Sequence, residues 1–352
     1  MKASRLRTSR RSSRSHSSCS AIRCKFGTGE QARAACSRRP FVQNGEGGVI
    51  AVSRGNQLNH ELYKLQRKIA PYGFILPGTA FYLMVTIVPM FMGLWMSLHR
   101  WNILRTNQTF IGLENYATVL SNPVFWEALK NTLTYTVGVV PVQIALALVV
   151  ALLLNVEIRG RTLFRLLYYL PVVTPLSIAA VIWQWIYHPQ MGLLNAALGM
   201  FGVAPKNWLG DPSIAMLSVI IVAIWAGLGY KMVIFLAALQ GIPSSYYEAA
   251  MIDGANRFDM FRYITVPLLK PTTLYVFVTS LIGSFQVFGL VSVLTGGGPL
   301  DATNVLVMHI YRRAFTDYQF GEAAAMSFVL FGIILVFTLV QWKVMGREVS
   351  YD

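Results

Sequence analysis

Charged residues and cysteines are scarce in most of this sequence. Only 13% of the 352 residues are charged, whereas 55% are hydrophobic, and a soluble domain usually carries about twice that charged fraction. The three cysteines, Cys19, Cys24 and Cys36, all lie near the N-terminus, and their spacings do not match those of paired zinc ligands. The composition therefore indicates a membrane protein in which neither disulfides nor thiol chemistry is central.

The motifs of nucleotide and metal chemistry are also absent from the sequence. There is no GxxxxGK[ST] loop, so the chain cannot cradle ATP phosphates by that device. There is no HExxH motif, and the long apolar runs contain no paired carboxylates. We therefore expect no catalytic residue, no metal site and no cofactor bound by this chain.

Positive charge is concentrated in residues 1–54. This segment holds 12 Lys/Arg and 2 Asp/Glu, which gives +10 of the net charge of +15. It is rich in Ser, Arg and Gly, cannot bury a core and is predicted to be disordered. Three interpretations stay open: a targeting peptide, a basic arm on anionic lipid, or a gene start assigned too far upstream, which we favour. Nucleic-acid binding does not follow from this tail.

Six apolar runs follow, each near the ~20 residues that a helix needs to cross a bilayer. They predict an all-α polytopic membrane protein with six transmembrane helices, at about 73–98, 131–154, 166–187, 214–239, 273–294 and 322–342. Several runs contain prolines, including Pro89, Pro141, Pro171 and Pro175. Such breaks suit helices around a hydrated pathway, although simple kinking explains any single proline equally well.

The distribution of Lys and Arg predicts the orientation of these helices. One side of the membrane would carry eleven of these residues near the helix ends: Lys64, Arg67, Lys68, Arg159, Arg161, Arg165, Arg257, Arg262, Lys270, Lys343 and Arg347. The other side would carry six: Arg100, Arg105, Lys130, Lys206, Arg312 and Arg313. Both termini are therefore predicted to be cytoplasmic.

Residues 241–270 form a polar stretch between two apolar runs, on the predicted cytoplasmic side. Ser245 and Glu248 have the spacing of a capping box at the start of a helix, and Gly254 suits the positive φ that closes one. Asn256 can cap a second helix. The stretch is therefore predicted to be a helix–turn–helix that faces water beside the membrane.

The second helix of this stretch is predicted to run to about Thr265 and to stop at Pro267. Two further connections, both predicted to be external, contain turn signals. Residues 188–213 suggest a small surface helix, and the run Gly296-Gly297-Gly298-Pro299 suggests a flexible turn.

The stretch at 241–270 resembles the EAA loop in the permease subunits of bacterial ABC importers. The resemblance is carried by Glu248-Ala249-Ala250, by Gly254, and by Ile264 with Val266-Pro267. The longer segment YEAAMIDGANRFDMFRYITVPLLKPTT is similar to the sugar and glycerol-3-phosphate branch of that family. In the family this loop is the coupling helix that docks on the ATPase. The resemblance therefore implies a coupling role for Glu248, Ala249, Ala250, Asp253, Gly254 and Arg257.

The resemblance extends over most of the chain after about residue 60, including the TGGGP segment. It implies a type I ABC importer permease fold with a first helix and external loop at 55–127, a permease domain at 128–342 and a cytoplasmic tail at 343–352. It also implies a bacterial inner-membrane location, a second permease subunit, two ATPase subunits that bind ATP-Mg, and an extracytoplasmic solute-binding protein.

Polar residues within the apolar runs are the candidates for contact with a solute. Lys231 is the only ionisable residue deep in a predicted helix, and a buried charge in a bilayer is a functional candidate by default. Amides and hydroxyls beside aromatic rings suit a sugar. We expect the pathway to include Gln184, Trp185, Lys231, Ser284 and Gln286. For Lys231 the alternatives are an extension to the membrane surface and pairing with a backbone carbonyl or a partner subunit. For the other residues the alternative is hydrogen bonds that only join helices.

The sequence thus predicts a non-hydrolysing permease subunit of an ATP-driven importer for a sugar or a glycerol-3-phosphate-like solute. A secondary transporter or channel without ATPase partners is the first alternative, but the predicted helices show neither intramembrane acids nor an inverted repeat. A membrane scaffold that only anchors a partner is the second. For the scaffold, the test is whether an ATPase copurifies with the chain.

Overall fold

The computed structural model describes residues 54–101, 108–156 and 159–345. The chain divides into two compact units, Met1–Gly73 and Phe74–Asp352. In the first unit the described residues belong to helix α1 (Arg54–Tyr82). The predictions made for residues 1–53 and 346–352 lie outside the described residues.

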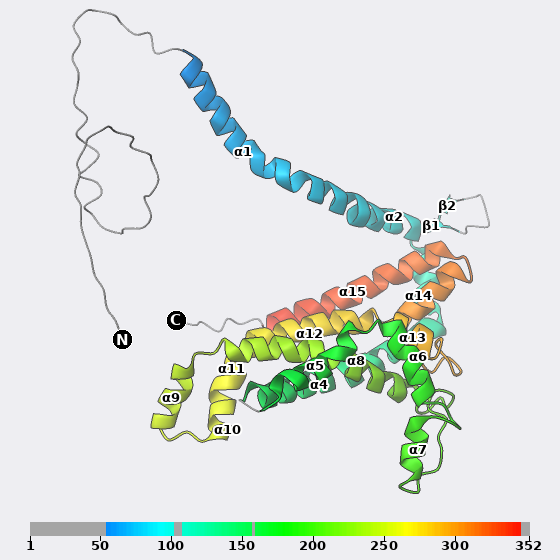
Figure 1. Ribbon diagram of the computed structural model, residues 1–352. Helices are drawn as coiled ribbons and strands as arrows, with labels where there is room; N and C mark the ends of the chain where they lie inside the picture. Colours follow the sequence, from blue (N-terminus) through cyan, green and yellow to red (C-terminus); the bar gives the residue numbers. More distant parts are fainter. Residues whose placement is uncertain (1–53, 102–107, 157–158, 346–352) are drawn as a thin grey trace, which may run out of the picture. The chain divides into compact units, whose positions relative to one another are not determined.

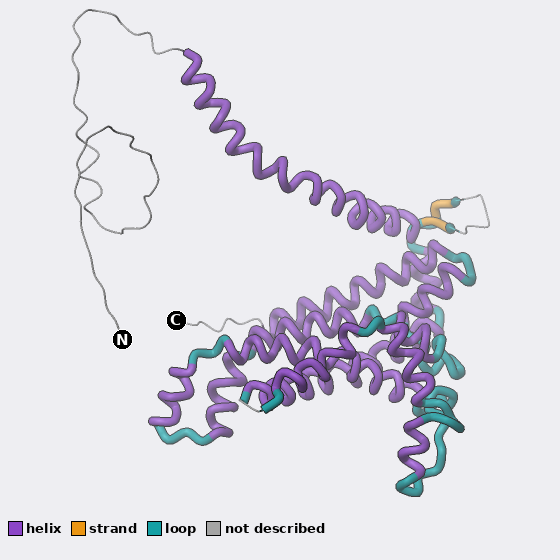
Figure 2. The backbone as a smooth tube through the Cα atoms, in the orientation of Figure 1, coloured by secondary structure: helices purple, strands orange, loops and turns teal. Residues whose placement is uncertain are grey.

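The described part of the second unit is built almost entirely from helices (Figures 1 and 2). Its single pair of strands, β1 (His99–Arg100) and β2 (Thr109–Phe110), is antiparallel. A π turn (Leu83–Ile87) joins α1 to α2 (Val88–Ser97), and a second π turn (Phe261–Thr265) follows α10. The other helices are α3 (Glu114–Ser121), α4 (Pro123–Asn155), α5 (Arg161–Val173), α6 (Leu176–Ile186), α7 (Leu193–Gly199), α8 (Ala215–Gln240), α9 (Ser244–Ile252), α10 (Arg257–Met260), α11 (Val266–Leu268), α12 (Lys270–Phe285), α13 (Gly289–Leu294), α14 (Leu306–Phe315) and α15 (Phe320–Met345).

Four helical segments in the described part of the chain are long and apolar enough to cross a membrane: Arg67–Ser97, Pro123–Asn155, Ala215–Gln240 and Phe320–Val344. Two helix pairs meet the same criterion together, but α5 and α6 are bent by 100° and the helix ending at Leu268 and α12 by 61°. The predicted all-α membrane fold is therefore confirmed, with four continuous spans and up to six if each bent pair is one span.

The third predicted span, 166–187, is not one helix. Thr174 ends α5 with an extended backbone, at a ψ of 127°, as expected for a residue that precedes a proline. Pro175 then stands before the first turn of α6. The break that the sequence suggested at this proline is therefore a sharp bend. The fifth predicted span, 273–294, is likewise divided between α12 and α13.

Pro89 and Pro267 are accommodated by the two π turns. In a regular α-helix a proline ring clashes with the carbonyl four residues before it. Each of these prolines instead follows a wider π turn in a continuous helical backbone. The predicted stop at Pro267 is therefore wrong. The helical backbone continues to Leu268. The chain then bends at Leu269, between α11 and α12.

The core of the second unit forms around α4 and α8, which share its most extensive helix contact. Small residues allow helices to approach closely in a membrane. A Cβ at Gly138 would lie 2.7 Å from Ile220 Cδ1, and a Cβ at Gly229 would lie 2.1 Å from the carbonyl oxygen of Tyr168 in α5. Within this unit, α9 and α10 lie at one end, and α7 lies at the opposite end (Figure 1).

Candidate functional site

Helices α9 and α10 form a helical hairpin, Ser244–Met260, between α8 and the turn that leads to α12. Pro243 occupies the N-cap position of α9 with a ψ of 136°, and no side chain caps this helix. The predicted Ser245–Glu248 capping box is therefore wrong. The N-cap lies two residues earlier than expected, so Ser245 and Glu248 do not occupy the N-cap and N3 positions that a capping box requires.

The turn of the hairpin is closed by Gly254, as predicted. Its φ is +82°, which is a left-handed conformation that glycine adopts without a steric penalty. The N–H of Ala255 donates to the carbonyl of Ala250 at 2.9 Å, and the N–H of Gly254 donates to that of Met251 at 3.2 Å. These two bonds form a Schellman motif, which satisfies free carbonyls at the end of α9.

The predicted cap at Asn256 is confirmed, and it is part of a complete capping box. Asn256 Oδ1 accepts the N–H groups of Phe258 at 2.8 Å and Asp259 at 3.0 Å. In return, the N–H of Asn256 donates to Asp259 Oδ2 at 3.3 Å. The capping box of this hairpin therefore starts its second helix, and local bonds fix the backbone on both sides of Gly254.

The side chains of the hairpin are mostly exposed. No residue of α9 or α10 is buried, and Ile252 and Phe258 are 87% and 66% exposed. The Tyr247 hydroxyl lies 3.0 Å from Thr265 Oγ1 at its base. The residues predicted to couple to an ATPase lie on this surface: Ala250 is half-buried, and Glu248, Ala249, Asp253, Gly254 and Arg257 are exposed. Exposed apolar side chains on a fixed backbone are typical of a docking surface.

A cavity of about 350 Å³ lies between α4, α8 and α12, with a contribution from α6 and α13. Hydroxyl, amide and aromatic groups lie among its apolar walls, together with one ammonium group and no carboxylate. Its lining consists of Tyr135, Val139, Gln143, Leu176, Ala223, Ala226, Gly227, Tyr230, Lys231, Thr279, Ser280, Gly283, Ser284 and Leu290. This mixed polar and apolar lining suits a small polar solute.

One wall of the cavity is fixed by Gln143, which is only 3% exposed. Its Nε2 donates to the carbonyls of Ala223 at 3.0 Å and Ile224 at 3.2 Å, and so joins α4 to α8. Gly227 leaves room for this amide, because a Cβ there would lie 2.2 Å from Nε2. The position of the wall therefore depends on an amide and a glycine that face each other.

The structure brings two of the five predicted pathway residues to this cavity, Lys231 and Ser284. The other three lie elsewhere. Gln184 Nε2 donates to carbonyl groups at the end of α13, the side chain of Trp185 is 78% exposed, and Gln286 is an exposed residue at the end of α12. A pathway role for these three therefore stays a prediction made from the sequence.

Sequence reasoning missed several polar residues of the lining. Gln143 carried a usable signal, because it is an amide in the middle of the second apolar run. Tyr230 carried one as well, because it is adjacent to Lys231. Thr279 and Ser280 carried none, since Ser and Thr commonly bond to carbonyls of their own helix, as Thr279 Oγ1 does at 2.8 Å to Tyr275.

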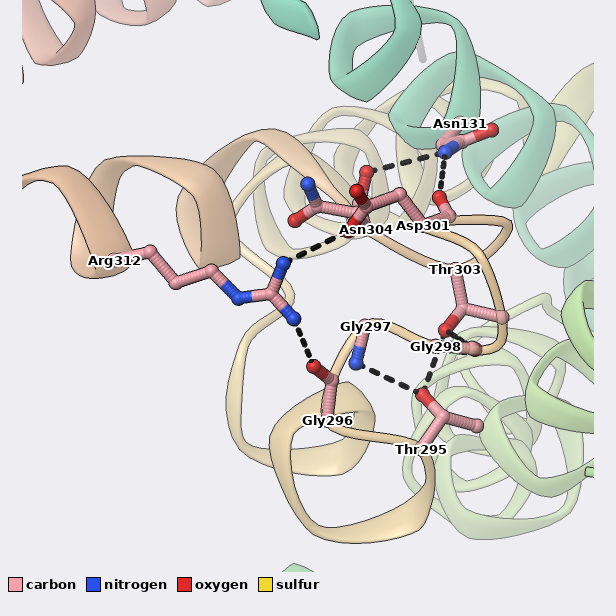
Figure 3. Close-up of polar contacts among 9 residues, drawn as sticks. All are labelled: Asn131, Thr295, Gly296, Gly297, Gly298, Asp301, Thr303, Asn304 and Arg312. Carbon is pink, nitrogen blue, oxygen red and sulfur yellow. Dashed lines mark hydrogen bonds and ion pairs between the residues drawn. The ribbon is translucent and has the colours of Figure 1, made fainter. Parts of the chain in front are cut away.

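A loop at Thr295–Asn304, at the opposite end of the unit from the hairpin, is fixed by its own side chains (Figure 3). Thr303 Oγ1 donates to the carbonyl of Gly298 at 2.6 Å and lies 2.7 Å from Thr295 Oγ1. The threonine is fully buried. The flexible turn expected from the glycine run is therefore wrong, because hydroxyl groups hold the chain on both sides of it.

Neighbouring helices also hold this loop in place (Figure 3). Arg312 of α14 donates to the carbonyl of Gly296 and forms an ion pair with Asp301 at 2.8 Å. Asn131 of α4 donates to the carbonyls of Asp301 at 2.9 Å and Asn304 at 3.2 Å. Among the described residues, there is no group of three or more His, Cys, Asp or Glu that could hold a metal ion.

Comparison with known sequences identifies the protein family. Residues 143–344 match the family described as binding-protein-dependent transport system inner membrane component. The probable ABC transporter permease protein YurN of Bacillus subtilis is 39% identical over 282 residues, which cover 79% of this chain and 96% of YurN. The trehalose/maltose transport system permease protein MalF of Thermococcus litoralis is 37% identical over 295 residues, which cover 83% of this chain and 98% of MalF.

A solved structure has the same fold. It is the crystal structure of a bacterial alginate ABC transporter in complex with an alginate pentasaccharide-bound periplasmic protein. The matching chain is 26% identical, with a TM-score of 0.72, and the match covers 81% of this chain and 97% of that chain. The protein described here therefore belongs to the binding-protein-dependent inner membrane components and is a membrane-spanning permease subunit of an ABC importer.

Proposed function

We propose that the α9–α10 hairpin is the surface on which a separate ATPase subunit docks. The observation that carries this proposal is the contrast between its backbone and its side chains. The backbone is fixed by the motifs at Gly254 and Asn256, whereas Ile252 and Phe258 remain exposed. A surface that is ordered before its partner binds loses little conformational entropy on docking.

The hairpin is also in a position to transmit movement to the cavity. It follows α8 after the short connection Gly241–Pro243 and leads through the second π turn into α12. These two helices carry most of the cavity lining, including Lys231 and Ser284. Closure of ATP-Mg-bound ATPase subunits would therefore shift both walls and switch the access of the pathway from one side of the membrane to the other.

The remainder of the complex follows the family. A second permease subunit, two ATPase subunits and an extracytoplasmic solute-binding protein would complete the importer, and ATP hydrolysis would take place in the ATPase subunits. The hairpin and both termini would then be cytoplasmic, in agreement with the excess of Lys and Arg on that side. The solute would be a sugar or a glycerol-3-phosphate-like compound, in line with the trehalose/maltose and alginate relatives.

Site-directed photocrosslinking tests the docking proposal. A photoreactive residue at Ile252 should crosslink to the ATPase subunit in membranes that contain the assembled importer. The matched control is Leu193, which is 72% exposed and belongs to α7. Helix α7 lies at the opposite end of the unit (Figure 1). The control position should not crosslink to the ATPase. Crosslinks to the ATPase from Leu193 rather than Ile252 would refute the proposal.

Ligand screening of the cognate solute-binding protein tests the proposed solute class. Thermal-shift assays with neutral sugars, acidic sugars and sn-glycerol 3-phosphate should yield a ligand among these classes. Recognition of an amino acid or a metal ion instead would contradict the proposed solute without affecting the docking proposal.

A further inference from the structure

The cavity between α4, α8 and α12 contains a cation that has no carboxylate beside it. Lys231 lines this cavity, and neither Asp nor Glu is among the lining residues. The ion pairs in the described part of the chain are formed by arginines and do not include Lys231. A charged side chain within a membrane span is costly to maintain and is typically functional.

A second group in the same cavity also lacks a partner. Ser280 of α12 is 8% exposed, and its Oγ is buried without a hydrogen-bond partner among the described residues. Its neighbour Ser284 differs, because Ser284 Oγ donates to the carbonyl of Leu281 at 2.8 Å. Buried hydroxyl groups almost always bond to protein, water or ligand. The cavity therefore offers an ammonium from α8 and a free hydroxyl from α12.

We infer that Lys231 makes this pathway selective for solutes that carry a carboxylate or phosphate group, and that Ser280 donates a hydrogen bond to the same solute. The inference rests on the proposed function, in which the cavity is part of the solute pathway. An oxyanion can accept bonds from both groups, and bonds to charged groups are the stronger ones. A neutral sugar would leave the ammonium without a counter-charge, so an acidic sugar or a phosphorylated polyol fits better.

Two other arrangements would remove the basis of this selectivity. The second permease subunit could supply a carboxylate that neutralises Lys231 in the complex. The long side chain of Lys231 could also extend towards the membrane surface, as lysines near the ends of spans do. In either case the cavity would hold no net positive charge, and the test below would then give a rate ratio near one.

The absence of cysteines after Cys36 allows a direct measurement of charge in the cavity. With the three tail cysteines replaced by serine, Gly283→Cys and Ser280→Cys each place a thiol in the lining. Position 283 accepts a side chain, because nothing lies within 4 Å of a Cβ there. The assembled importer in membrane vesicles is treated with a sulfonate-bearing and a trimethylammonium-bearing methanethiosulfonate. The ratio of the two rates is divided by the ratio at the exposed control Leu193→Cys, which lies outside the proposed ATPase-docking surface.

The normalised ratio should favour the anionic reagent by about tenfold with Lys231 present, since a nearby unit charge in a partly shielded site has an effect of that order. It should fall to about one in Lys231→Gln and remain high in Lys231→Arg. A ratio near one in the Lys231 protein, or no reaction at either position, would overturn the inference. The measurement reads the charge in the cavity and requires neither transport nor ATP hydrolysis, so its result does not depend on whether the hairpin couples to an ATPase.

Protection of Gly283→Cys from modification distinguishes the two sources of the anionic group. A galacturonate trisaccharide and sn-glycerol 3-phosphate are compared with maltotriose, which is neutral, in the presence of the binding protein. Slower modification with the uronate indicates an acidic sugar, and slower modification with the phosphate indicates a phosphorylated polyol. Equal or better protection by maltotriose would overturn the inference.

Discussion

The α9–α10 hairpin and the Thr295–Asn304 loop are both polar segments at the ends of the same helical unit, and they use their side chains differently. In the loop, Thr303 bonds to the loop itself, and Asp301 forms an ion pair with Arg312 of α14, which also bonds to Gly296. In the hairpin, backbone bonds and one capping box fix the chain, and most side chains face outwards. The loop therefore uses its polar side chains to hold its own structure. The hairpin is held by its backbone, so its side chains remain available to a partner.

The largest expected effect comes from a charge placed on the hairpin surface. Gly254→Asp should reduce transport-coupled ATP hydrolysis more than about tenfold, because an added charge at a docking surface can cost several kcal/mol. The matched control is Gly254→Asn, which has nearly the same shape, tolerates positive φ and adds no charge. ATPase activity of the reconstituted importer and the amount of membrane-inserted chain are the measurements. Normal activity in Gly254→Asp, or equal loss in both variants, would contradict the expectation.

The second prediction removes a hydrogen-bonding group from the Thr295–Asn304 loop. Thr303→Val keeps the shape of the side chain but removes the hydroxyl that bonds to Gly298 and Thr295. Because the site is buried, loss of the bond to the Gly298 carbonyl should cost about 1–3 kcal/mol and lower the midpoint of thermal unfolding in detergent. Thr295 Oγ1 keeps its bonds to Val291 and Gly297. Thr303→Ser should retain most of the stability. An unchanged midpoint in the valine variant would show that the hydroxyl does not hold the loop.

A smaller effect is expected when the cap of the second hairpin helix is removed. Asn256→Ala removes the cap of α10 and should cost about 1 kcal/mol locally. Hydrogen exchange at the amides of Phe258 and Asp259 should become about fivefold faster, since 1 kcal/mol changes an equilibrium by about that factor. Asn256→Asp retains an acceptor oxygen and should exchange like the native chain. Equal exchange in all three proteins would mean that other contacts order this helix.

The smallest effect concerns pH at the loop end. His309 of α14 is buried, and its Nε2 has no hydrogen-bond partner among the described residues. Burial, followed by the charges of Arg313 and Arg312, lowers the pKa of His309 from its ordinary value of 6.5. Its contribution to stability is therefore present above pH 6.5 and is lost as the pH falls through the lowered pKa.

Thermal unfolding between pH 7.5 and 5 tests this pH dependence. The midpoint of the native protein should fall as the pH decreases below 6.5. In His309→Gln, which cannot take up a proton, this part of the decrease should be absent. An identical pH dependence in the two proteins would exclude His309 as its source.

The sequence predicted the helices and the local signals better than the places where the chain bends. The apolar runs identified the membrane segments, and Gly254 and Asn256 indicated the turn and the second helix, because these features depend on neighbouring residues. The start of α9 and the continuation through Pro267 were mispredicted. At Pro267 the preceding turn widened into a π turn and the helix continued. At the start of α9, Pro243 itself took the N-cap position, so no side chain was needed there.

The cavity was predictable only in part. Lys231 stood out because a charge is rare in an apolar run, and Ser284 was found as a polar residue beside aromatic ones. Gln143 and Ser280 belong to the same cavity from α4 and α12, yet their approach depends on how those helices pack. The Thr295–Asn304 loop shows the same limit, since its order depends on Asn131 from a distant part of the chain.

The contact between Gly229 and the carbonyl oxygen of Tyr168 restricts how the pathway can rearrange. The space between α8 and α5 there would not admit a methyl group, because a Cβ would lie 2.1 Å from that oxygen. If either helix rotated, a larger side chain would enter this contact and push α5 and α8 apart. Residues 161–173 should therefore travel with α8 as one body in each transport cycle, and the sharp bend at Thr174 is the nearest place where that body can hinge against α6.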